Sequence, residues 1–271
     1  MKKHRFSWSH LYLVLVFAVL YAPILFLIVY SFSQGNSMDH FHGFTLQHYQ
    51  ELFDDRRMIV IVINTMLIAL LSALISTLIG TLGALQIDKT TNKLTRGTIL
   101  SLNNILMVSP DVIIGASFLI FFTRFHIGLG FWTVLLSHIA FEIPIVVLMV
   151  LPRLSEMSGT MLDAAEDLGA TNWQMLSRVI LPFISPGIFA GFFMALTYSL
   201  DDFAVTFFVT GNGFSTLSVE IYSRARQGIS LEINALSGLM FIFALGLIVG
   251  YYFIQQANQH RLQKHQKSGA V

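Results

Sequence analysis

Four carboxylates lie inside stretches of sequence that are otherwise apolar. By counting along the helices that such stretches form, Asp111 and Glu142 each fall near the middle of a segment, and the adjacent pair Asp201 and Asp202 falls in the outer half of a third. An ionised group in an apolar segment is costly and marks a functional pathway by default. No Lys or Arg lies in these segments to neutralise the charge. The carboxylates therefore predict a route for a solute with two or more positive charges.

Other side chains in these segments suit the same chemistry. His138 lies four residues before Glu142, on the same face of a helix. Phe141 and Phe203, with a tryptophan and a tyrosine, offer aromatic faces for ammonium groups. The predicted substrate path comprises Asp111, Asp201, Asp202, His138, Glu142, Trp132 and Tyr198.

Each of these residues also has a structural interpretation. Asp111 follows a proline and suits the cap of a helix that restarts there. His138 and Glu142 suit a local pair that satisfies its own hydrogen bonds. Since successive helical residues point about 100° apart, at most one of Asp201 and Asp202 is expected to face the path, while the other bonds a neighbouring helix or a partner subunit. Aromatic side chains on spanning helices are commonly packing or lipid-facing residues.

The composition excludes several kinds of chemistry. The absence of cysteine excludes disulfides, thiolate metal sites and Cys nucleophiles. The nine His residues show no metal-binding spacing, and no GxxxxGK[ST] phosphate loop is present. We therefore expect no catalytic residues, no metal and no cofactor bound by this chain, and if nucleotide energy is used, another polypeptide must bind the nucleotide. The net charge of +1 gives no indication of a nucleic-acid partner.

The elements that position these residues are predicted to be transmembrane helices. Of the 271 residues 55% are hydrophobic and only 11% charged, which is unusual for a soluble domain. A spanning helix needs about 20 mostly apolar residues. The first apolar run is too long for a signal peptide and is read as a retained helix. The expected fold is an all-α integral membrane protein with a transmembrane domain over 11–256 and six spans, at about 11–32, 59–85, 102–122, 131–151, 185–209 and 235–254.

Basic residues fall mostly on one side of this arrangement. Six spans place both termini on the same side, and that side carries 11 of the 16 Lys and Arg residues, including every lysine. Cytoplasmic loops retain such residues. Residues 1–10 and the tail 257–271 are therefore predicted to be cytoplasmic.

The longest cytoplasmic stretch, about 155–182, carries a motif of fixed spacing. We predict two short helices separated by a turn at Gly169 and ended by Pro182, which together make a compact knob. The motif closely resembles the EAA motif of ABC importer permeases, with Asp163 in place of the usual Glu. The resemblance implies that the knob docks in a cleft of the ATPase through Asp163, Ala164, Ala165, Gly169, Leu181 and Pro182.

An interfacial hairpin lying on the bilayer is the structural alternative for this stretch. Such a helix should carry a basic polar face, yet residues 154–177 contain no Lys or Arg and four acidic residues. Anionic headgroups would repel an acidic helix. The charge pattern favours docking on a protein.

Further runs resemble permeases of the spermidine/putrescine (PotC) type, in order across nearly the whole chain. The resemblance implies the type I importer (MetI-like) fold in the inner or plasma membrane of a prokaryote. It also implies a second homologous permease subunit, two ATPase subunits and an extracellular or periplasmic polyamine-binding protein as partners. The runs begin at Met107, Gly130, Ser137, Ser199, Phe208, Ile221 and Asn234.

The expected function is that of the membrane subunit of an ATP-driven polyamine importer. Within the same class, a permease for thiamine, ferric iron or an aminophosphonate is an alternative. A secondary transporter would use the carboxylates for proton or sodium coupling, but the EAA-like knob, the six spans and the lack of an inverted repeat argue against it. The glycine pairs Gly80/Gly83 and Gly187/Gly191 are expected to permit close helix packing.

Overall fold

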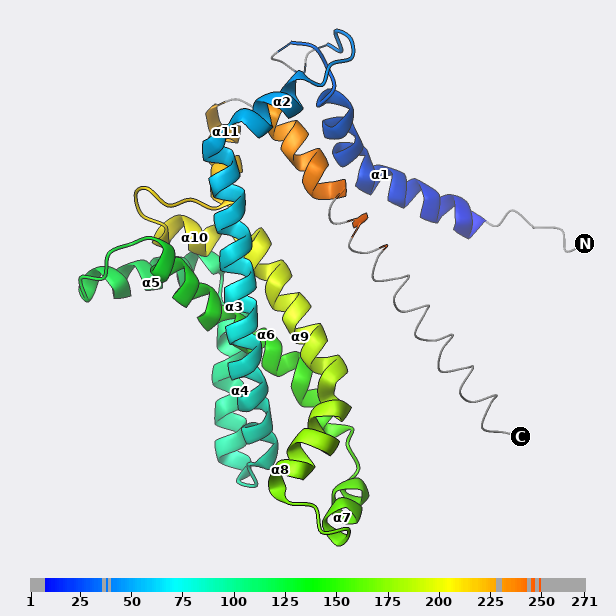
Figure 1. Cartoon of the computed structure of the whole chain (residues 1–271), viewed down its shortest axis with the longest axis vertical. Coiled ribbons are helices and arrows are strands. Elements are labelled where there is room, and N and C mark those ends of the chain that lie inside the picture. The colour runs from blue at the N-terminus through cyan, green and yellow to red at the C-terminus, as the bar shows by residue number, and fades with distance from the viewer. Residues whose placement is uncertain are drawn as a thin grey trace, which may run out of the picture. The chain divides into compact units, whose positions relative to one another are not determined.

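Helices make up most of the residues that the structure describes. The computed structural model describes residues 8–35, 38, 40–227, 231–242, 245–246 and 249. In these ranges extended pairing is limited to one isolated bridge between Ser33 and Phe44. The all-α class is confirmed (Figure 1). The helices are α1 (Trp8–Tyr30), α2 (Gln47–Asp54), α3 (Arg56–Lys89), α4 (Lys93–Val108), α5 (Asp111–Arg124), α6 (Phe131–Ser155), α7 (Gly159–Asp167), α8 (Asn172–Met175), the π-helix η1 (Leu176–Ile180), α9 (Leu181–Asp201), α10 (Ala204–Val209) and α11 (Leu217–Gln227), with an apolar helix at Leu231–Ile242.

The chain forms two compact units, Val60–Tyr222 and the remainder on either side of it. In the second of these, Arg224 donates to Asp55 at 3.2 Å and to Glu232 at 2.7 Å, which joins three separate stretches of chain. Burial raises the pKa of the Asp55 carboxyl, but the backbone N–H groups of Met58 and Arg57 and the Arg224 guanidinium outweigh it and hold that pKa below its usual value.

Four helices are long and apolar enough to cross a membrane: Leu11–Tyr30, Arg56–Lys89, Phe131–Ser155 and Asn172–Asp201. The first three match the spans expected at 11–32, 59–85 and 131–151. The helix Leu231–Ile242 covers the first part of the segment expected at 235–254. Most of the rest of that segment, residues 1–7 and the tail 257–271 lie outside the described residues.

The prediction of one continuous span over 102–122 is wrong. Helix α4 ends at Val108 and α5 begins at Asp111, with their axes bent by 103°. The cause is the Ser109–Pro110 pair, since proline has no N–H and disfavours the helical conformation of the residue before it. Ser109 is accordingly extended, with φ −69° and ψ 137°.

The prediction of a span over 185–209 needs a similar correction at both ends. Helix α9 ends at Asp201, and an extended Asp202 (φ −63°, ψ 119°) separates it from α10. At the other end, Pro182 does not stop a helix, because Asn172–Asp201 is one helical run of 30 residues. The π-helical turn explains the difference: the Leu181 N–H donates to the Leu176 carbonyl, five residues back, and Pro182 then occupies the first turn of α9.

The unit Val60–Tyr222 is held together where α3, α6 and α9 meet. One buried cluster includes Ala73, Val146, Val150, Ile184 and Ala195 from these three helices. A second cluster lies around α5, α6 and α10 and includes Ile114, Phe122, Val134, Val205 and Val209. Figure 1 shows α9 running beside α6, with α7 and α8 at one end of this pair and α10 at the other.

The predicted close packing at the glycines is confirmed at three of the four positions. A Cβ on Gly80 would lie 2.7 Å from the Val146 Cβ, and one on Gly187 would lie 2.9 Å from the Met149 carbonyl oxygen. A Cβ on Gly191 would lie 3.3 Å from the Val146 Cα. Gly83 differs, since its nearest neighbour would be the Val147 Cγ2 at an ordinary 3.8 Å.

This contrast predicts unequal effects of two matched substitutions in α3. We expect Gly80→Ala to destabilise the protein by about 1–3 kcal/mol, the usual cost of overpacking a close contact. Gly83→Ala, three residues away on the same helix, should unfold like the wild type. Thermal unfolding of the purified protein in detergent measures both, and equal midpoints for the two variants would contradict the close approach of α3 and α6.

Candidate functional site: an acidic cavity at two helix breaks

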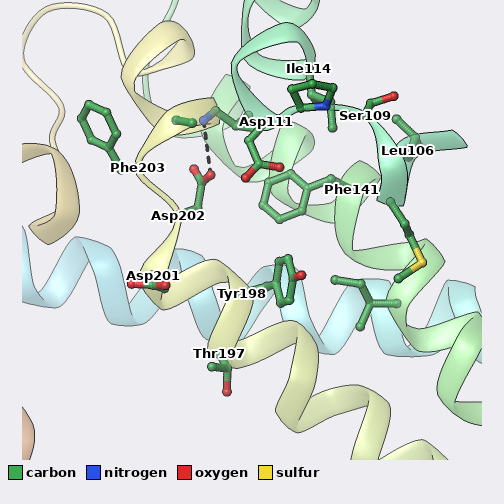
Figure 2. A pocket seen from close by; sticks show the side chains of 15 residues that line it. Leu106, Ser109, Asp111, Ile114, Phe141, Thr197, Tyr198, Asp201, Asp202 and Phe203 are labelled. Atoms are coloured by element: carbon green, nitrogen blue, oxygen red, sulfur yellow. Dashed lines mark hydrogen bonds between the residues drawn. The ribbon is translucent and has the colours of Figure 1, made fainter. Parts of the chain in front are cut away.

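A cavity of about 710 Å³ lies where the two interrupted helices meet α6. Its walls come from the end of α4, the start of α5, one face of α6, the end of α9 and the start of α10. Figure 2 shows the side chains of Asp111 and Asp202 pointing toward one another, with Phe141 and Tyr198 beside them. The lining residues are Leu106, Met107, Ser109, Pro110, Asp111, Ile114, Phe141, Ile145, Thr197, Tyr198, Asp201, Asp202, Phe203, Ala204 and Val205.

The helix breaks bring the carboxylates to this cavity. Asp111 is the first residue of α5, directly after the break at Pro110, and Asp201 is the last residue of α9. Asp202 lies in the extended link to α10. Three of the four predicted acidic residues therefore line one space, and none of the lining residues is Lys or Arg.

Two of these carboxylates are free of protein partners. Asp111 and Asp201 are exposed and make no hydrogen bond or ion pair with any residue that the structure describes. The alternative in which Asp111 caps the restarting helix through its side chain is therefore wrong, since the N-cap residue is Pro110 and α5 has no side-chain cap. The negative charge of Asp111 still lies favourably in the first turn of α5.

Asp202 is held much more tightly. Its Oδ1 accepts the Val205 N–H at 3.2 Å, and its Oδ2 accepts the Thr206 N–H at 2.8 Å and the Thr206 hydroxyl at 2.7 Å. The carboxylate therefore caps the N-terminus of α10, where backbone N–H groups have no helical partner. The expectation that one of the two adjacent aspartates bonds a neighbouring helix is met by Asp202, although both line the cavity.

His138 and Glu142 do not line the cavity; both are fully buried behind it. The His138 ring contacts the Ser199 hydroxyl through Nδ1 at 2.7 Å and the Thr206 hydroxyl through Nε2 at 2.8 Å. Glu142 accepts from Ser72 at 2.8 Å and from Ser76 at 2.9 Å, and its Oε1 lies 3.8 Å from His138 Nδ1. The two residues expected on the substrate path instead form a buried network that links α3, α6, α9 and α10.

The aromatic residues expected on the path also fall into two groups, those that line the cavity and one that does not. Tyr198, Phe141 and Phe203 line the cavity, and Phe203 packs on Tyr222 with ring centroids 4.2 Å apart. Trp132 does not line it and has 70% of its surface exposed. Its placement matches the alternative of a lipid-facing or packing residue rather than a path residue.

Four residues of this site were not assigned a role from the sequence. Ser72, Ser76, Ser199 and Thr206 supply every hydroxyl of the buried network. A partial signal existed, because Ser72 and Ser76 are four residues apart and so share a face of α3. The residues that bond Ser72 and Ser76 lie on other helices, and the sequence does not specify where those helices lie relative to α3.

The first short helix and the Gly169 turn of the predicted knob are present, whereas its second helix is the start of the long run Asn172–Asp201 that leads to the cavity. Gly169 has φ +77°, the left-handed conformation expected of it, and separates α7 from α8. Asp163, Ala164 and Ala165 lie on α7, while Leu181 and Pro182 begin α9. Leu168 and Trp173, on either side of the turn, expose 89% and 72% of their surface.

Comparison with known families agrees with this architecture. Residues 76–264 match the family model described as the binding-protein-dependent transport system inner membrane component. The chain belongs to this family. Spermidine/putrescine permease PotC of Haemophilus influenzae is 33% identical to this permease over 256 residues, covering 94% of this chain and 99% of that protein. Putrescine permease PotI of Escherichia coli K12 is 31% identical over 273 residues, covering 97% and 96%.

Solved structures share the fold of this permease. A chain of a bacterial ABC transporter involved in the import of the acidic polysaccharide alginate superposes with a TM-score of 0.72 at 19% identity, covering 92% of this chain and 94% of that chain. A chain of the methionine ABC transporter MetNI in an inward-facing conformation gives 0.53 at 19% identity, covering 75% and 95%. The permease therefore has the fold of ABC importer membrane subunits, the MetI-like class expected from the sequence.

The different bonding of the two adjacent aspartates predicts different effects on stability. We expect Asp202→Ala to destabilise the permease by about 1 kcal/mol or more, because it removes the cap of α10. Asp201→Ala removes an exposed carboxylate that has no partner and should unfold like the wild type. Thermal unfolding of both purified variants measures the difference, and a larger loss for Asp201→Ala would contradict the capping role of Asp202.

Proposed function

We propose that this chain is the membrane-spanning permease subunit of an ATP-driven importer of polyamines such as spermidine and putrescine, in which it forms half of the translocation path. The observation that carries the proposal is the cavity lined by Asp111, Asp201 and Asp202 without any Lys or Arg. The names of its relatives, which are spermidine/putrescine and putrescine permeases, support the same substrate class.

The cavity suits a flexible chain with several ammonium groups. Carboxylates in a low-dielectric site are costly when alone, and a polycation that passes between them offsets that cost. The free lone pairs of Asp111 and Asp201 are available to ammonium donors. Tyr198, Phe141 and Phe203 provide apolar and aromatic surface for methylene spacers and for cation–π contact.

The proposed assembly contains a second homologous permease subunit, two ATPase subunits and an external polyamine-binding protein. The shared fold with ABC importer subunits and the exposed turn at Gly169 support it. ATP and Mg are used by the ATPase. We further propose six spans, with the bent pair α4 and α5 counted as one broken span and the helix from Leu231 as the start of the last. Both termini are proposed to be cytoplasmic, in the inner membrane of a bacterium, which the distribution of Lys and Arg supports.

The substrate class is tested by removing the free carboxylates without changing their shape. We expect Asp111→Asn and Asp201→Asn each to lower the uptake rate of labelled spermidine by about tenfold, the equivalent of about 1.4 kcal/mol of lost attraction. The measurement is initial uptake by the full complex in proteoliposomes, with assembly checked by size-exclusion chromatography.

The matched control is Asp88→Asn, which neutralises an exposed carboxylate near the end of α3, away from the cavity lining. It should transport like the wild type. Full uptake in both cavity variants would refute the acidic path. Uptake by the wild type of thiamine, ferric iron or an aminophosphonate in place of spermidine would refute the substrate class.

ATPase docking is tested at two glycines of the knob. A Cβ at Gly169 or at Gly159 would meet nothing within 4 Å, but only Gly169 has a positive φ. We expect Gly169→Ala to strain the turn by about 1–2 kcal/mol and to reduce retention of the ATPase on the purified permease. Gly159→Ala should retain the ATPase fully. Equal retention by the two variants in a pull-down would argue against docking through this turn.

A further inference from the structure

A continuous chain of hydrogen bonds leads from the cavity wall to the buried Glu142. It begins at Asp202 Oδ2, which accepts from Thr206 at 2.7 Å, and continues to His138 Nε2 at 2.8 Å. From His138 Nδ1 it reaches the Ser199 hydroxyl at 2.7 Å, then the Ser72 hydroxyl at 3.1 Å and Glu142 Oε1 at 2.8 Å. Every member is buried or nearly so, and Asp202 alone also lines the cavity.

Counting hydrogens assigns the donors and acceptors between Asp202 and His138. The Thr206 hydroxyl has a single proton, which it donates to the Asp202 carboxylate. The Thr206 oxygen must therefore accept from His138, so Nε2 carries a proton. The only ring nitrogen whose protonation is left open is Nδ1, which faces Ser199.

Between His138 and Glu142, the hydrogen bonds can be arranged in two complete ways. In the first, Glu142 is protonated and donates to Ser72, which donates to Ser199, which donates to a neutral His138 at Nδ1. In the second, His138 is an imidazolium that donates to Ser199, which donates to Ser72, which donates to a Glu142 carboxylate. Passing between them breaks one N–H or O–H bond and forms another at each of three steps. No proton is exchanged with bulk water.

The two arrangements differ in where one negative charge lies. With Asp202 ionised, the three groups carry a net charge of −1 in both. In the first arrangement that charge is on Asp202, beside the cavity. In the second, the imidazolium, whose Nε2 lies 3.5 Å from Asp202 Oδ2, neutralises Asp202, and the charge is on Glu142.

The segments of α3, α6, α9 and α10 around this network carry no basic side chain that competes for the proton. Residues 60–88, 131–152 and 179–209 contain no Lys or Arg. The groups that face His138 are Ser199 of α9, Thr206 of α10, and the carboxylates of Asp202 and Glu142, and Ser76 of α3 faces only Glu142. Asp111 and Asp201 belong to the cavity wall, and Asp88 lies near the end of α3, away from the cavity lining.

We propose that His138, Ser199, Ser72 and Glu142 form an internal proton relay that leaves the charge of Asp202 uncompensated when a cation occupies the cavity, and that compensates it with an imidazolium, with the net negative charge on Glu142, when the cation leaves. A cation beside Asp202 repels an imidazolium close by and so favours the first arrangement. When the cavity empties, the imidazolium again compensates Asp202. His138 and Glu142 are thus positioning residues, and the inference rests on the proposed cationic substrate.

Infrared difference spectroscopy on the full complex in nanodiscs tests the relay directly. Addition of spermidine should produce the C=O stretch of a newly protonated carboxylic acid, shifted in D₂O. The band should be absent in Glu142→Gln, which keeps the shape of the side chain but has no carboxylate to protonate. A band that persists in Glu142→Gln, or a wild type that transports spermidine without any such band, would overturn the relay.

Ser72→Ala and Ser76→Ala are the matched pair, and they decide the question even if Glu142→Gln fails to assemble. Both serines are fully buried on α3 and both donate to Glu142, but only Ser72 contacts Ser199. Ser76 donates in both arrangements, whereas Ser72 must reverse. We expect Ser72→Ala to lose most of the band and to lower uptake per ATP hydrolysed by about tenfold, or about 1.4 kcal/mol.

Ser76→Ala should keep the band, with uptake within about twofold of the wild type, the equivalent of about 0.4 kcal/mol. Equal effects of the two serine variants would overturn the relay while leaving the proposed function intact, because Asp111→Asn and Asp201→Asn test that function separately. A wild type that takes up no polyamine would refute the proposed function, and the relay with it.

Discussion

The structure around the cavity depends on the carboxylate of Asp202. By accepting two backbone N–H groups and one hydroxyl of α10, it satisfies the donors that a helix break exposes. In a membrane such donors have no water to bond. Irregular backbone is tolerated there only where protein groups or a water-filled cavity supply its hydrogen bonds. The break after α9 therefore requires an acceptor at this position. The same carboxylate that stabilises the break also supplies charge to the cavity, so stability and function share one residue.

The second break, between α4 and α5 at Pro110, forms in a different way and completes the site. Pro110 is the N-cap residue, its carbonyl accepts from the Ile113 and Ile114 N–H groups, and no side chain caps α5, so Asp111 remains free for a solute. Close helix packing behind the breaks, with Gly80 against Val146, brings Ser72 and Ser76 of α3 within reach of Glu142. A membrane cavity with free carboxylates in front and a satisfied polar network behind follows from these two local features.

Much of this could be predicted from the sequence, because the relevant signals are local. Long apolar runs identified the straight helices, and Gly169 indicated its turn. The failures have a common cause: hydropathy averages over windows of about 19 residues, so it does not register the single extended residues Ser109 and Asp202 that break two spans. Nor does helical spacing tell whether His138 faces a cavity or a neighbouring helix, since that is decided by partners more than 60 residues away along the chain.

The helix Asn172–Asp201 connects the two functional ends of the permease. It begins at the exposed turn after α7 and ends at the cavity. It stays continuous past Pro182, which lies in the first turn of α9 directly after the π-helical turn. A helix without a break moves as a rigid element. In the proposed assembly, a displacement applied at the turn near Gly169 would be carried along this helix to Asp201 and to the adjoining link at Asp202. The irregular backbone that can absorb such a movement lies at the cavity, where a change of geometry alters the contacts offered to a solute.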